Sequence, residues 1–433
     1  MPEIGNDFTF EEFSTELEDF RMSKVGKFER LWKIGYGGSI DQRLLLHDGI
    51  ICFGCCDHSV YAISAADGRL IWRFRTSGPI VESSPVLWND TIYIGSYDQN
   101  LYAIDASTGE MRWKFRTQGE IGASACISNG IVYFGSRDQN AYAVRADDGS
   151  LVWKFRTMDE IMSTPAVWDG KVFIGSFDHI LYCLDASSGA LIWKFPALQE
   201  IYNANPFLIH RGVIYFGSFD NYLRAVAIDR PNGPKELWRF YLGAYATAAS
   251  PVLHNNILYQ ETRDGSLIAL TLDGKELWRF RTREAVAVPL VHEGRIYLGS
   301  ADYNMYCLDM KGRILWKFPA QGYVWWEPVV WGNTLCFSSW DCHIYAVDKN
   351  TGKELWRFNT GSDPSYIPPI SEGFLLEISR TMPEEESKEG RKRYDFNVTE
   401  EAQAGSFYKA RITYQVSTQY REKGKYQTTD DDF

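Results

Sequence analysis

The pattern on which most of the chain is built reads Ala346-Val347-Asp348-Lys349-Asn350-Thr351-Gly352-Lys353-Glu354-Leu355-Trp356, followed by Arg357 and Phe358. Asp and Gly in its middle are typical of a tight turn, because glycine adopts positive φ at no steric cost and an Asp side chain accepts hydrogen bonds from nearby backbone amides. Apolar residues on either side of the turn predict two β-strands. The stretch therefore predicts a β-hairpin whose second strand carries Trp and Phe on one face.

Related stretches recur through the chain, and each ends on a tryptophan. Their spacings are 40, 41, 40, 40, 45, 40, 38 and 40 residues. A period near 40 with only β signals predicts propeller blades rather than a helical solenoid. The nine tryptophans bound eight intervals, so we expect an all-β, eight-bladed β-propeller of four-stranded antiparallel blades. The tryptophans are Trp32, Trp72, Trp113, Trp153, Trp193, Trp238, Trp278, Trp316 and Trp356.

The second interval illustrates the strand pattern. Its outer strand, residues 110–115, alternates so that Met111, Trp113 and Phe115 are expected on one face and the charged residues in water. An acid also recurs in an earlier turn of every interval, which favours a turn-forming role over eight separate ligands. These acids are Asp57, Asp98, Asp138, Asp178, Asp220, Asp264, Asp302 and Asp341.

The two ends of the chain differ from the repeat, which gives three predicted segments. Residues 1–30 contain a capping box at Thr9 and Glu12 followed by apolar residues at helical spacing, which predicts a short amphipathic helix. Residues 31–380 form the propeller, with spare strands at 365–370 and 373–378 expected at the seam or on a face. Residues 381–433 contain a charged loop and two further strand signals, a C-terminal β extension.

The repeat also resembles a known family. Ala103-x-Asp105-x-x-Thr108-Gly109-x-x-x-Trp113 and its counterpart at Ala346–Trp356 resemble the tryptophan-docking repeat of the pyrroloquinoline-quinone (PQQ)-type eight-bladed propellers, whose architecture is like that of WD40 proteins. The resemblance covers about residues 31–378. It implies that the tryptophan of one blade packs against the next blade and ties the two together.

The same resemblance implies a quinoprotein dehydrogenase, with calcium beside the quinone, an Asp base and often a vicinal disulfide. Cys55-Cys56 matches that disulfide, but it occupies the repeated turn before Asp57, as an ordinary variant of the blade pattern. Intervals of 38–45 residues leave no room for the insertions that cover the quinone in those enzymes. We therefore expect no cofactor and no metal, and keep a small-molecule binder or PQQ-dependent dehydrogenase as the alternative.

The composition of the chain limits the classes of partner that we expect it to bind. The formal net charge of -11 argues against the binding of nucleic acid and of anionic membrane surfaces. The sequence contains no run of about 18 apolar residues, so no membrane span is predicted. The N-terminus lacks the pattern of a secretory signal, and the eight cysteines show no metal-binding spacing. Buried free thiols in a cytoplasmic protein are the expectation.

A recognition surface is expected where the repeats differ, which is in the loops that enter each innermost strand around the central channel. Trp325-Trp326-Glu327 departs most from its counterparts. Aromatic packing that seals the channel is the competing interpretation of this stretch. The function predicted is a monomeric, non-enzymatic scaffold that binds a protein partner through this face. The candidate residues are Glu82, Tyr202, Asn203, Asn205, Tyr245, Tyr323, Trp325, Trp326, Glu327 and Tyr366.

Overall fold

The computed structural model describes residues 38–203, 205–243, 249–361, 395–398 and 412–415. The chain divides into two units, residues 1–368 and 369–433. The predicted N-terminal helix, the spare strands at 365–378 and the predicted segment boundaries at 30 and 380 lie outside the described residues.

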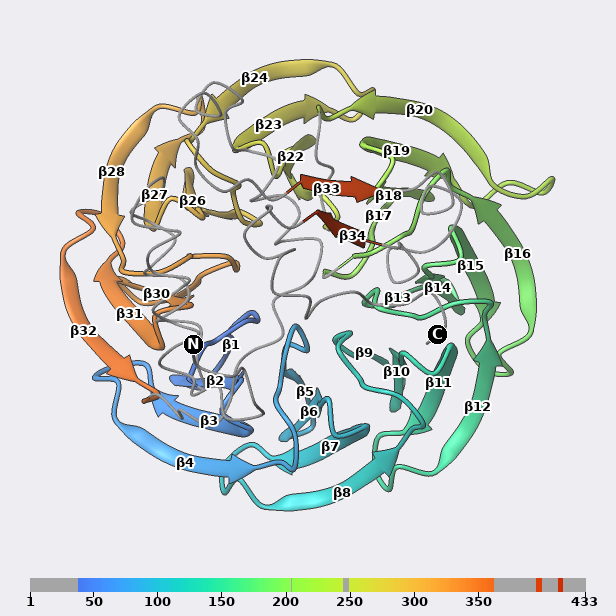
Figure 1. Ribbon diagram of the computed structural model, residues 1–433, viewed down its shortest axis with the longest axis horizontal. Helices are drawn as coiled ribbons and strands as arrows, with labels where there is room; N and C mark the ends of the chain where they lie inside the picture. The colour runs from blue at the N-terminus through green and yellow to red at the C-terminus, as the bar shows by residue number, and fades with distance from the viewer. Residues whose placement is uncertain (1–37, 204, 244–248, 362–394, 399–411, 416–433) are drawn as a thin grey trace. The chain divides into compact units, whose positions relative to one another are not determined.

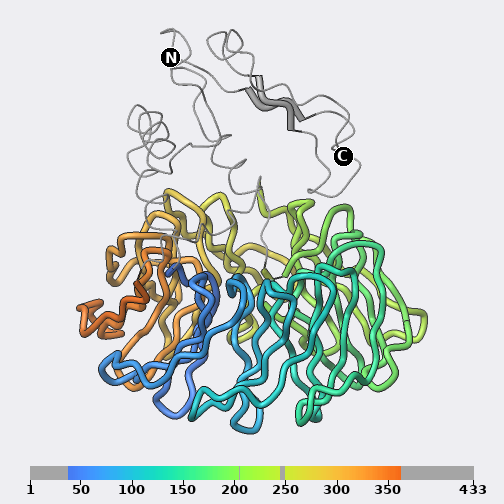
Figure 2. The backbone as a smooth tube through the Cα atoms, turned by 60° about the horizontal axis from the view of Figure 1, so that its bottom comes forward, coloured from blue at the N-terminus to red at the C-terminus, as the bar shows by residue number. Residues whose placement is uncertain are grey.

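Eight four-stranded sheets make up the described part of the first unit, and this confirms the eight-bladed propeller (Figure 1). In every sheet the four strands follow chain order from the centre of the ring to its outer edge, and each pair is antiparallel. Figure 2 shows the chain passing from one blade to the next around the ring. Sequence neighbours are therefore spatial neighbours throughout.

The first four blades share one strand pattern, with a three-residue inner strand and longer strands outside it. Blade 1 contains β1 (Leu45–His47), β2 (Ile50–Cys55), β3 (Ser59–Ser64) and β4 (Leu70–Arg75). Blade 2 contains β5 (Val86–Trp88), β6 (Thr91–Gly95), β7 (Asn100–Asp105) and β8 (Met111–Arg116). Blade 3 contains β9 (Cys126–Ser128), β10 (Ile131–Gly135), β11 (Asn140–Arg145) and β12 (Leu151–Arg156). Blade 4 contains β13 (Ala166–Trp168), β14 (Lys171–Gly175), β15 (Ile180–Asp185) and β16 (Leu191–Pro196).

The other four blades repeat the pattern. Blade 5 contains β17 (Leu208–His210), β18 (Val213–Ser218), β19 (Tyr222–Ala227) and β20 (Lys235–Tyr241). Blade 6 contains β21 (Val252–His254), β22 (Ile257–Glu261), β23 (Ser266–Thr271) and β24 (Glu276–Arg281). Blade 7 contains β25 (Leu290–His292), β26 (Arg295–Gly299), β27 (Asn304–Asp309) and β28 (Ile314–Pro319). Blade 8 contains β29 (Val329–Trp331), β30 (Thr334–Ser339), β31 (His343–Asp348) and β32 (Glu354–Asn359).

The hairpin turn between the third and fourth strands has the predicted chemistry. Asp348 Oδ1 accepts hydrogen bonds from the backbone N–H groups of Asn350 at 3.0 Å and Thr351 at 2.8 Å. Gly352 has a φ of 72°, which is unfavourable for residues with a side chain. The repeated Asp and Gly are thus explained by the geometry of this turn.

Tryptophan docking between blades is confirmed. Trp113 of blade 2 lies on Gly149 of blade 3, where an added Cβ would be 2.6 Å from the ring, and its indole N–H donates to the Ala146 carbonyl at 2.9 Å. Six other joints place the tryptophan of one blade against the turn glycine of the next. These pairs are Trp72 with Gly109, Trp153 with Gly189, Trp238 with Gly274, Trp278 with Gly312, Trp316 with Gly352 and Trp356 with Gly68.

The joint between blades 4 and 5 is the exception. Blade 5 has the longest interval, and its turn glycine, Gly233, has no heavy atom within 4 Å of an added Cβ. Trp193 of blade 4 packs within the same apolar cluster as Phe173 and Ile228. With the insertion in this turn, the half-buried tryptophan therefore still packs against the next blade but makes no contact with the turn glycine.

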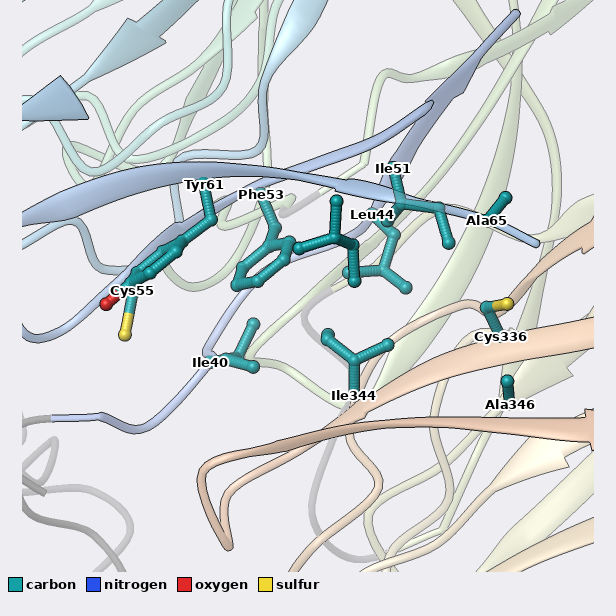
Figure 3. Close-up of a cluster of buried hydrophobic side chains, with 11 residues drawn as sticks. Ile40, Leu44, Ile51, Phe53, Cys55, Tyr61, Ala65, Cys336, Ile344 and Ala346 are labelled. Atoms are coloured by element: carbon teal, nitrogen blue, oxygen red, sulfur yellow. The ribbon is translucent and has the colours of Figure 1, made fainter. Parts of the chain in front are cut away.

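The ring closes between blades 8 and 1, and each of these blades takes its four strands from one continuous segment. A buried apolar cluster joins Phe53 and Tyr61 of blade 1 to Cys336 and Ile344 of blade 8 (Figure 3). The last joint thus uses the same kind of apolar contact as the others.

The eight turn acids are structural, as predicted. Asp98 Oδ2 accepts hydrogen bonds from Tyr102 Oη at 2.6 Å and from the backbone N–H of Ser77, in the segment that precedes blade 2, at 2.9 Å. Asp138 and Asp178 repeat both bonds, while Asp220 pairs with Arg224. Each of these acids therefore joins its turn by hydrogen bonds to a neighbouring strand or segment of the chain.

The expected inward position of Met111 is wrong. Trp113 and Phe115 pack in the core of the blade 2–blade 3 joint, but Met111 is 47% exposed. The cause is a register shift between β7 and β8, which pairs Ala103 with Trp113 and the next residue, Ile104, with Met111. A bulge of this kind adds one residue to the outer strand and turns the side chains before it to other directions. All eight blades carry the shift.

In the second unit, β33 (Asp395–Val398) pairs antiparallel with β34 (Ile412–Gln415), which confirms strands at the two C-terminal strand signals, while residues 373–379, predicted to pair with them, lie outside the described residues. Across the described residues no helix has the length and apolar character needed to cross a membrane.

Candidate recognition surface at the channel mouth

Two loops of each blade meet at one end of the central channel, which we call the mouth. The segment that enters the innermost strand is tied to the turn between the second and third strands of its own blade and to that of the preceding blade. In blade 3, the Arg137 N–H donates to the Glu120 carbonyl at 3.0 Å, and the Ile121 N–H donates to the Ser96 carbonyl of blade 2 at 3.2 Å. Backbone bonds therefore fix the mouth loops relative to one another.

This arrangement adds a second set of side chains that the sequence analysis did not include. They occupy the third position of the turn read as Gly-Ser-x-Asp, directly before each turn acid. The Gly, Ser and Asp of the turn recur with few changes, while the residue at x varies in charge and size. This variation is the signal in the sequence from which the residues at x could have been predicted. The residues at x are Cys56, Tyr97, Arg137, Phe177, Phe219, Arg263, Ala301 and Trp340.

Blades 7 and 8 contribute an aromatic cluster, which consists of Tyr303, Tyr323, Trp325 and Trp340. The ring centroid of Tyr323 lies 5.6 Å from that of Tyr303, 6.2 Å from that of Trp325 and 5.1 Å from that of Trp340. The two tyrosines are buried, whereas Trp325 and Trp340 are half-buried. Binding is favoured when a partner covers the remaining exposed surface of such amphipathic rings.

Trp326 has a different role from its neighbour Trp325. It is only 4% exposed, and its indole N–H donates to Asp41 Oδ1 of blade 1 at 3.0 Å. The indole N–H of Trp340 donates to the same oxygen at 3.1 Å. Burial raises the pKa of Asp41, while these two bonds lower it. Trp326 is therefore buried at the seam and ties blade 8 to blade 1.

Glu82 and Tyr202 approach each other across the channel from blades 2 and 5. The Tyr202 hydroxyl hydrogen-bonds the Glu82 carboxylate. Burial and the nearby carboxylate of Asp41 raise the pKa of Glu82 to about 7, against the opposing effect of Arg137 and Arg263. Glu82 also has a φ of 62°, a left-handed conformation that is rare for residues other than glycine, asparagine and aspartate.

Aromatic rings and two arginines surround Tyr202 and Glu82. The ring of Tyr202 stacks on Phe219 at 6.2 Å, and the Arg263 guanidinium lies 5.8 Å from the centre of the Phe219 ring. Arg137 pairs with Glu120 at 3.3 Å and lies 5.2 Å from the centre of the Tyr97 ring. The mouth therefore offers flat apolar faces beside charges of both signs.

The remaining predicted residues are placed as follows. Asn203 and Asn205 are buried, and neither Nδ2 of Asn203 nor Oδ1 of Asn205 has a hydrogen-bond partner within the described chain. Burial raises the pKa of Glu327, which faces the opposite charge of Arg43. Tyr245 and Tyr366 lie outside the described residues. The structure thus brings most of the predicted residues to one mouth, on entering segments of blades 2, 5 and 8.

Cys55 and Cys56 are buried, and no disulfide joins them. Cys55 Sγ lies 3.5 Å from the Ser39 carbonyl, and burial raises the pKa of both thiols. In the described ranges no three His, Cys, Asp or Glu side chains are grouped closely enough to hold a metal ion.

Comparisons with known proteins agree on the fold. A family model described as outer membrane protein assembly factor BamB matches residues 56–164, 137–233 and 224–324, which together span more than half of the chain. No curated protein matches the chain. Several solved structures do, at identities that show the fold alone.

The crystal structure of BamB from Moraxella catarrhalis is 20% identical and has a TM-score of 0.59, covering 69% of this chain and 91% of that one. The computationally designed Ika8 protein is 16% identical with a TM-score of 0.62, covering 75% and 98%. The quinohemoprotein alcohol dehydrogenase ADHIIG from Pseudomonas putida HK5 is 15% identical with a TM-score of 0.58, covering 72% and 70%.

Proposed function

Because the chain belongs to the PQQ-like β-propeller repeat family, we propose that it is a non-enzymatic scaffold that binds a protein partner at the channel mouth. Support comes from the aromatic cluster of blades 7 and 8, where half-buried Trp325 and Trp340 lie beside two buried tyrosines. Tryptophan, tyrosine and arginine are the residues that most often carry the binding free energy of protein interfaces. The mouth combines all three, and its loops differ from blade to blade while the scaffold beneath them is constant.

The test uses a tagged full-length chain, expressed in its native cells, and measures co-purifying proteins by quantitative mass spectrometry. Trp325→Ala is the test variant. Trp331→Ala is the matched control, because Trp331 is 40% exposed on β29 and lies outside the mouth. We expect Trp325→Ala to lose at least one partner that the wild type and Trp331→Ala both retain. Identical partner sets for all three proteins would contradict the proposal.

Trp326 is not a suitable test residue, although it is adjacent to Trp325. Its indole N–H bonds to Asp41 across the seam, so removing it changes the ring as well as the surface. Thermal melts of Trp325→Ala and Trp331→Ala should therefore accompany the pull-down. Equal melting temperatures would assign any lost partner to the surface.

A small-molecule site in the channel is the second candidate function. Glu82, Tyr202, Arg137 and Arg263 approach one another there, and similar folds include a quinohemoprotein alcohol dehydrogenase. PQQ and calcium, added separately and together, test this directly. A ligand that binds only the folded state stabilises it by about 2.7 kcal/mol at a hundred times its Kd. A rise in Tm with PQQ and calcium together would overturn the scaffold proposal, and an unchanged Tm supports it.

We also propose that the protein works in the cytoplasm. No disulfide joins any two of the eight cysteines, all of which lie in the described residues, and seven of them are buried. Free thiols persist in a reducing compartment, whereas an oxidising one favours disulfides. Alkylation of the protein from its native cells under denaturing conditions should label eight thiols. A Cys55–Cys56 disulfide in that material would contradict this location.

A further inference from the structure

The outer strands of the propeller expose apolar side chains, and they do so unequally. The bulge in each outer strand turns the two residues before the docking tryptophan toward solvent. In blades 5, 6 and 8 the first of these is a glutamate that pairs with an arginine three residues later, as in Glu276–Arg279 at 2.9 Å. In blades 1, 3, 4 and 7 both are aliphatic and 40–52% exposed, including Leu151 and Val152 of blade 3 and Leu191 and Ile192 of blade 4.

Blades 3 and 4 also differ in the loop that follows the outer strand. Met158 is 81% exposed and Leu198 is 63% exposed, which makes them the two most exposed large apolar side chains among the described residues. The corresponding residues of the other blades are small or polar. They are Ser77, Gln118, Gly243, Arg283, Gln321 and Gly361. Among the described blades, the combination of an exposed aliphatic pair with an exposed apolar loop residue therefore occurs in blades 3 and 4, which are neighbours.

In blades 3 and 4, basic residues lie in the sequence between the exposed aliphatic pair and the exposed apolar loop residue. Lys154, Arg156 and Lys194 are exposed, and no described acid forms an ion pair with any of them. Arg156 bonds only the neutral side chain of Gln139, at 3.1 Å. Exposed cations without a described ion pair also occur on the outer strands of blades 1, 2 and 7, so these three are distinguished by lying beside the exposed Met158 and Leu198. We call these nine residues, Leu151, Val152, Lys154, Arg156, Met158, Leu191, Ile192, Lys194 and Leu198, the rim patch.

The outer edge of blade 3 is also available for backbone pairing. β12 is the last strand of its sheet, and Figure 1 shows it beside β16 on the perimeter. The Thr157 N–H donates inward to the Gln139 carbonyl, so the alternate residues Lys154 and Arg156 direct their N–H and C=O groups outward. β16 and β28 carry Pro196 and Pro319 at the position of Arg156, and proline cannot donate to an added strand. The other six outer strands, β12 among them, lack that protection, and β12 is the one of these six that is followed by an exposed apolar loop residue, Met158.

We propose that the rim patch docks an extended, acidic segment of a partner protein, which adds to blade 3 as a fifth strand along β12. Backbone hydrogen bonds at Lys154 and Arg156 hold the segment, and its carboxylates face the three unpaired cations. Its apolar residues cover Leu151, Val152 and Met158. A lipid surface could meet the cations and the aliphatic groups, but it would leave the outward N–H and C=O groups of β12 unpaired, and an extended peptide pairs them.

The probe is a ten-residue peptide that alternates Glu with Thr or Val, measured by fluorescence anisotropy on the full-length protein. A peptide with Lys in place of Glu is its control. Arg156→Pro introduces the proline that β16 and β28 already accept, and it should weaken binding about tenfold by removing an outward donor. Lys154→Glu should weaken it to a similar extent, and added salt should do so too. Arg281→Pro, the same change in β24 of blade 6, should leave binding unchanged.

Thermal melts of both proline variants show whether the fold is intact. Three results would overturn the proposal. The first is equal binding of the Glu and Lys peptides, and the second is an equal loss of binding in Arg281→Pro. The third is binding to phosphatidylglycerol vesicles without binding to the acidic peptide, which would assign the patch to a membrane surface.

Discussion

The joint between blades 2 and 3 and the joint between blades 8 and 1 use the same tryptophan and glycine, but their hydrogen bonds differ. Trp113 covers Gly149 and its indole N–H donates to Ala146. Trp356 covers Gly68, yet its buried indole N–H has no acceptor within the described chain. At the seam the bonds lie instead at the mouth, where Trp326 and Trp340 donate to Asp41. Ring closure therefore depends on aromatic residues of the recognition surface.

The largest expected effect separates the two joints directly. Trp113→Ala should lower the free energy of unfolding by about 3–5 kcal/mol through lost packing, and by about 1 kcal/mol more through the lost hydrogen bond to Ala146. Trp356→Ala removes packing but no indole hydrogen bond, so it should lower the free energy of unfolding by about 1 kcal/mol less than Trp113→Ala does. Urea denaturation of both variants measures the difference. Equal losses would show that the indole bond contributes nothing to the ordinary joint.

The bonds at the seam can be removed without touching either docking tryptophan. Asp41→Ala leaves the indole N–H groups of Trp326 and Trp340 without their acceptor, which should cost about 2–4 kcal/mol. Asp41→Asn keeps an oxygen in the same place and should recover part of this loss. If Asp41→Ala unfolds at the wild-type urea concentration, the two indole bonds to Asp41 contribute nothing measurable to the stability of the seam.

Charge at the mouth predicts a pH dependence that the outer joints lack. Glu82 titrates near pH 4.5 in the unfolded chain and at about 7 in the folded one, so the folded state binds more protons between these values. Its contribution therefore stabilises the fold at low pH and is lost as the pH rises through about 7. Since Glu82 is partly solvated, we expect Glu82→Gln to raise the stability at pH 8 by on the order of 1–2 kcal/mol and to have little effect at pH 4.5.

Denaturation curves of wild type and Glu82→Gln across pH 4.5–8 measure this difference, with Glu110→Gln as the control at an exposed glutamate. A constant gap between wild type and Glu82→Gln at every pH would exclude titration of Glu82 as its cause.

The smallest effect on stability is expected at Trp325. Its side chain is half-buried, whereas that of Trp326 is 4% exposed and donates a hydrogen bond to Asp41 of blade 1. Trp325→Ala should therefore cost less than about 1 kcal/mol, whereas Trp326→Ala should cost about 3–5 kcal/mol. Thermal melts of the two variants compare neighbours that the sequence presents as equivalent. Similar losses would show that Trp325 also belongs to the seam.

The predictions that succeeded rest on local chemistry that repeats. An Asp and a Gly at fixed spacing before a tryptophan specify one turn, and eight copies of the interval specify eight blades. Met111 shows where this reasoning fails, because the alternation of a strand assumes an uninterrupted ladder and the bulge between Ala103 and Ile104 breaks it. The mouth residues Arg137, Phe219 and Trp340 were not predicted, because they occupy the variable position of a turn whose other residues are nearly constant.

The amino-acid sequence by itself determined the repeat, the number of blades, the docking tryptophans and the loops where function is to be sought. Each of these follows from interactions between residues close in the chain or one repeat apart. Tertiary structure decided which half of the Trp325-Trp326 pair remains accessible, and that Asp41 faces a tryptophan 285 residues later. It also decided that Glu82 meets Tyr202 across the channel. Contacts across a ring depend on its curvature and closure, which no local pattern encodes.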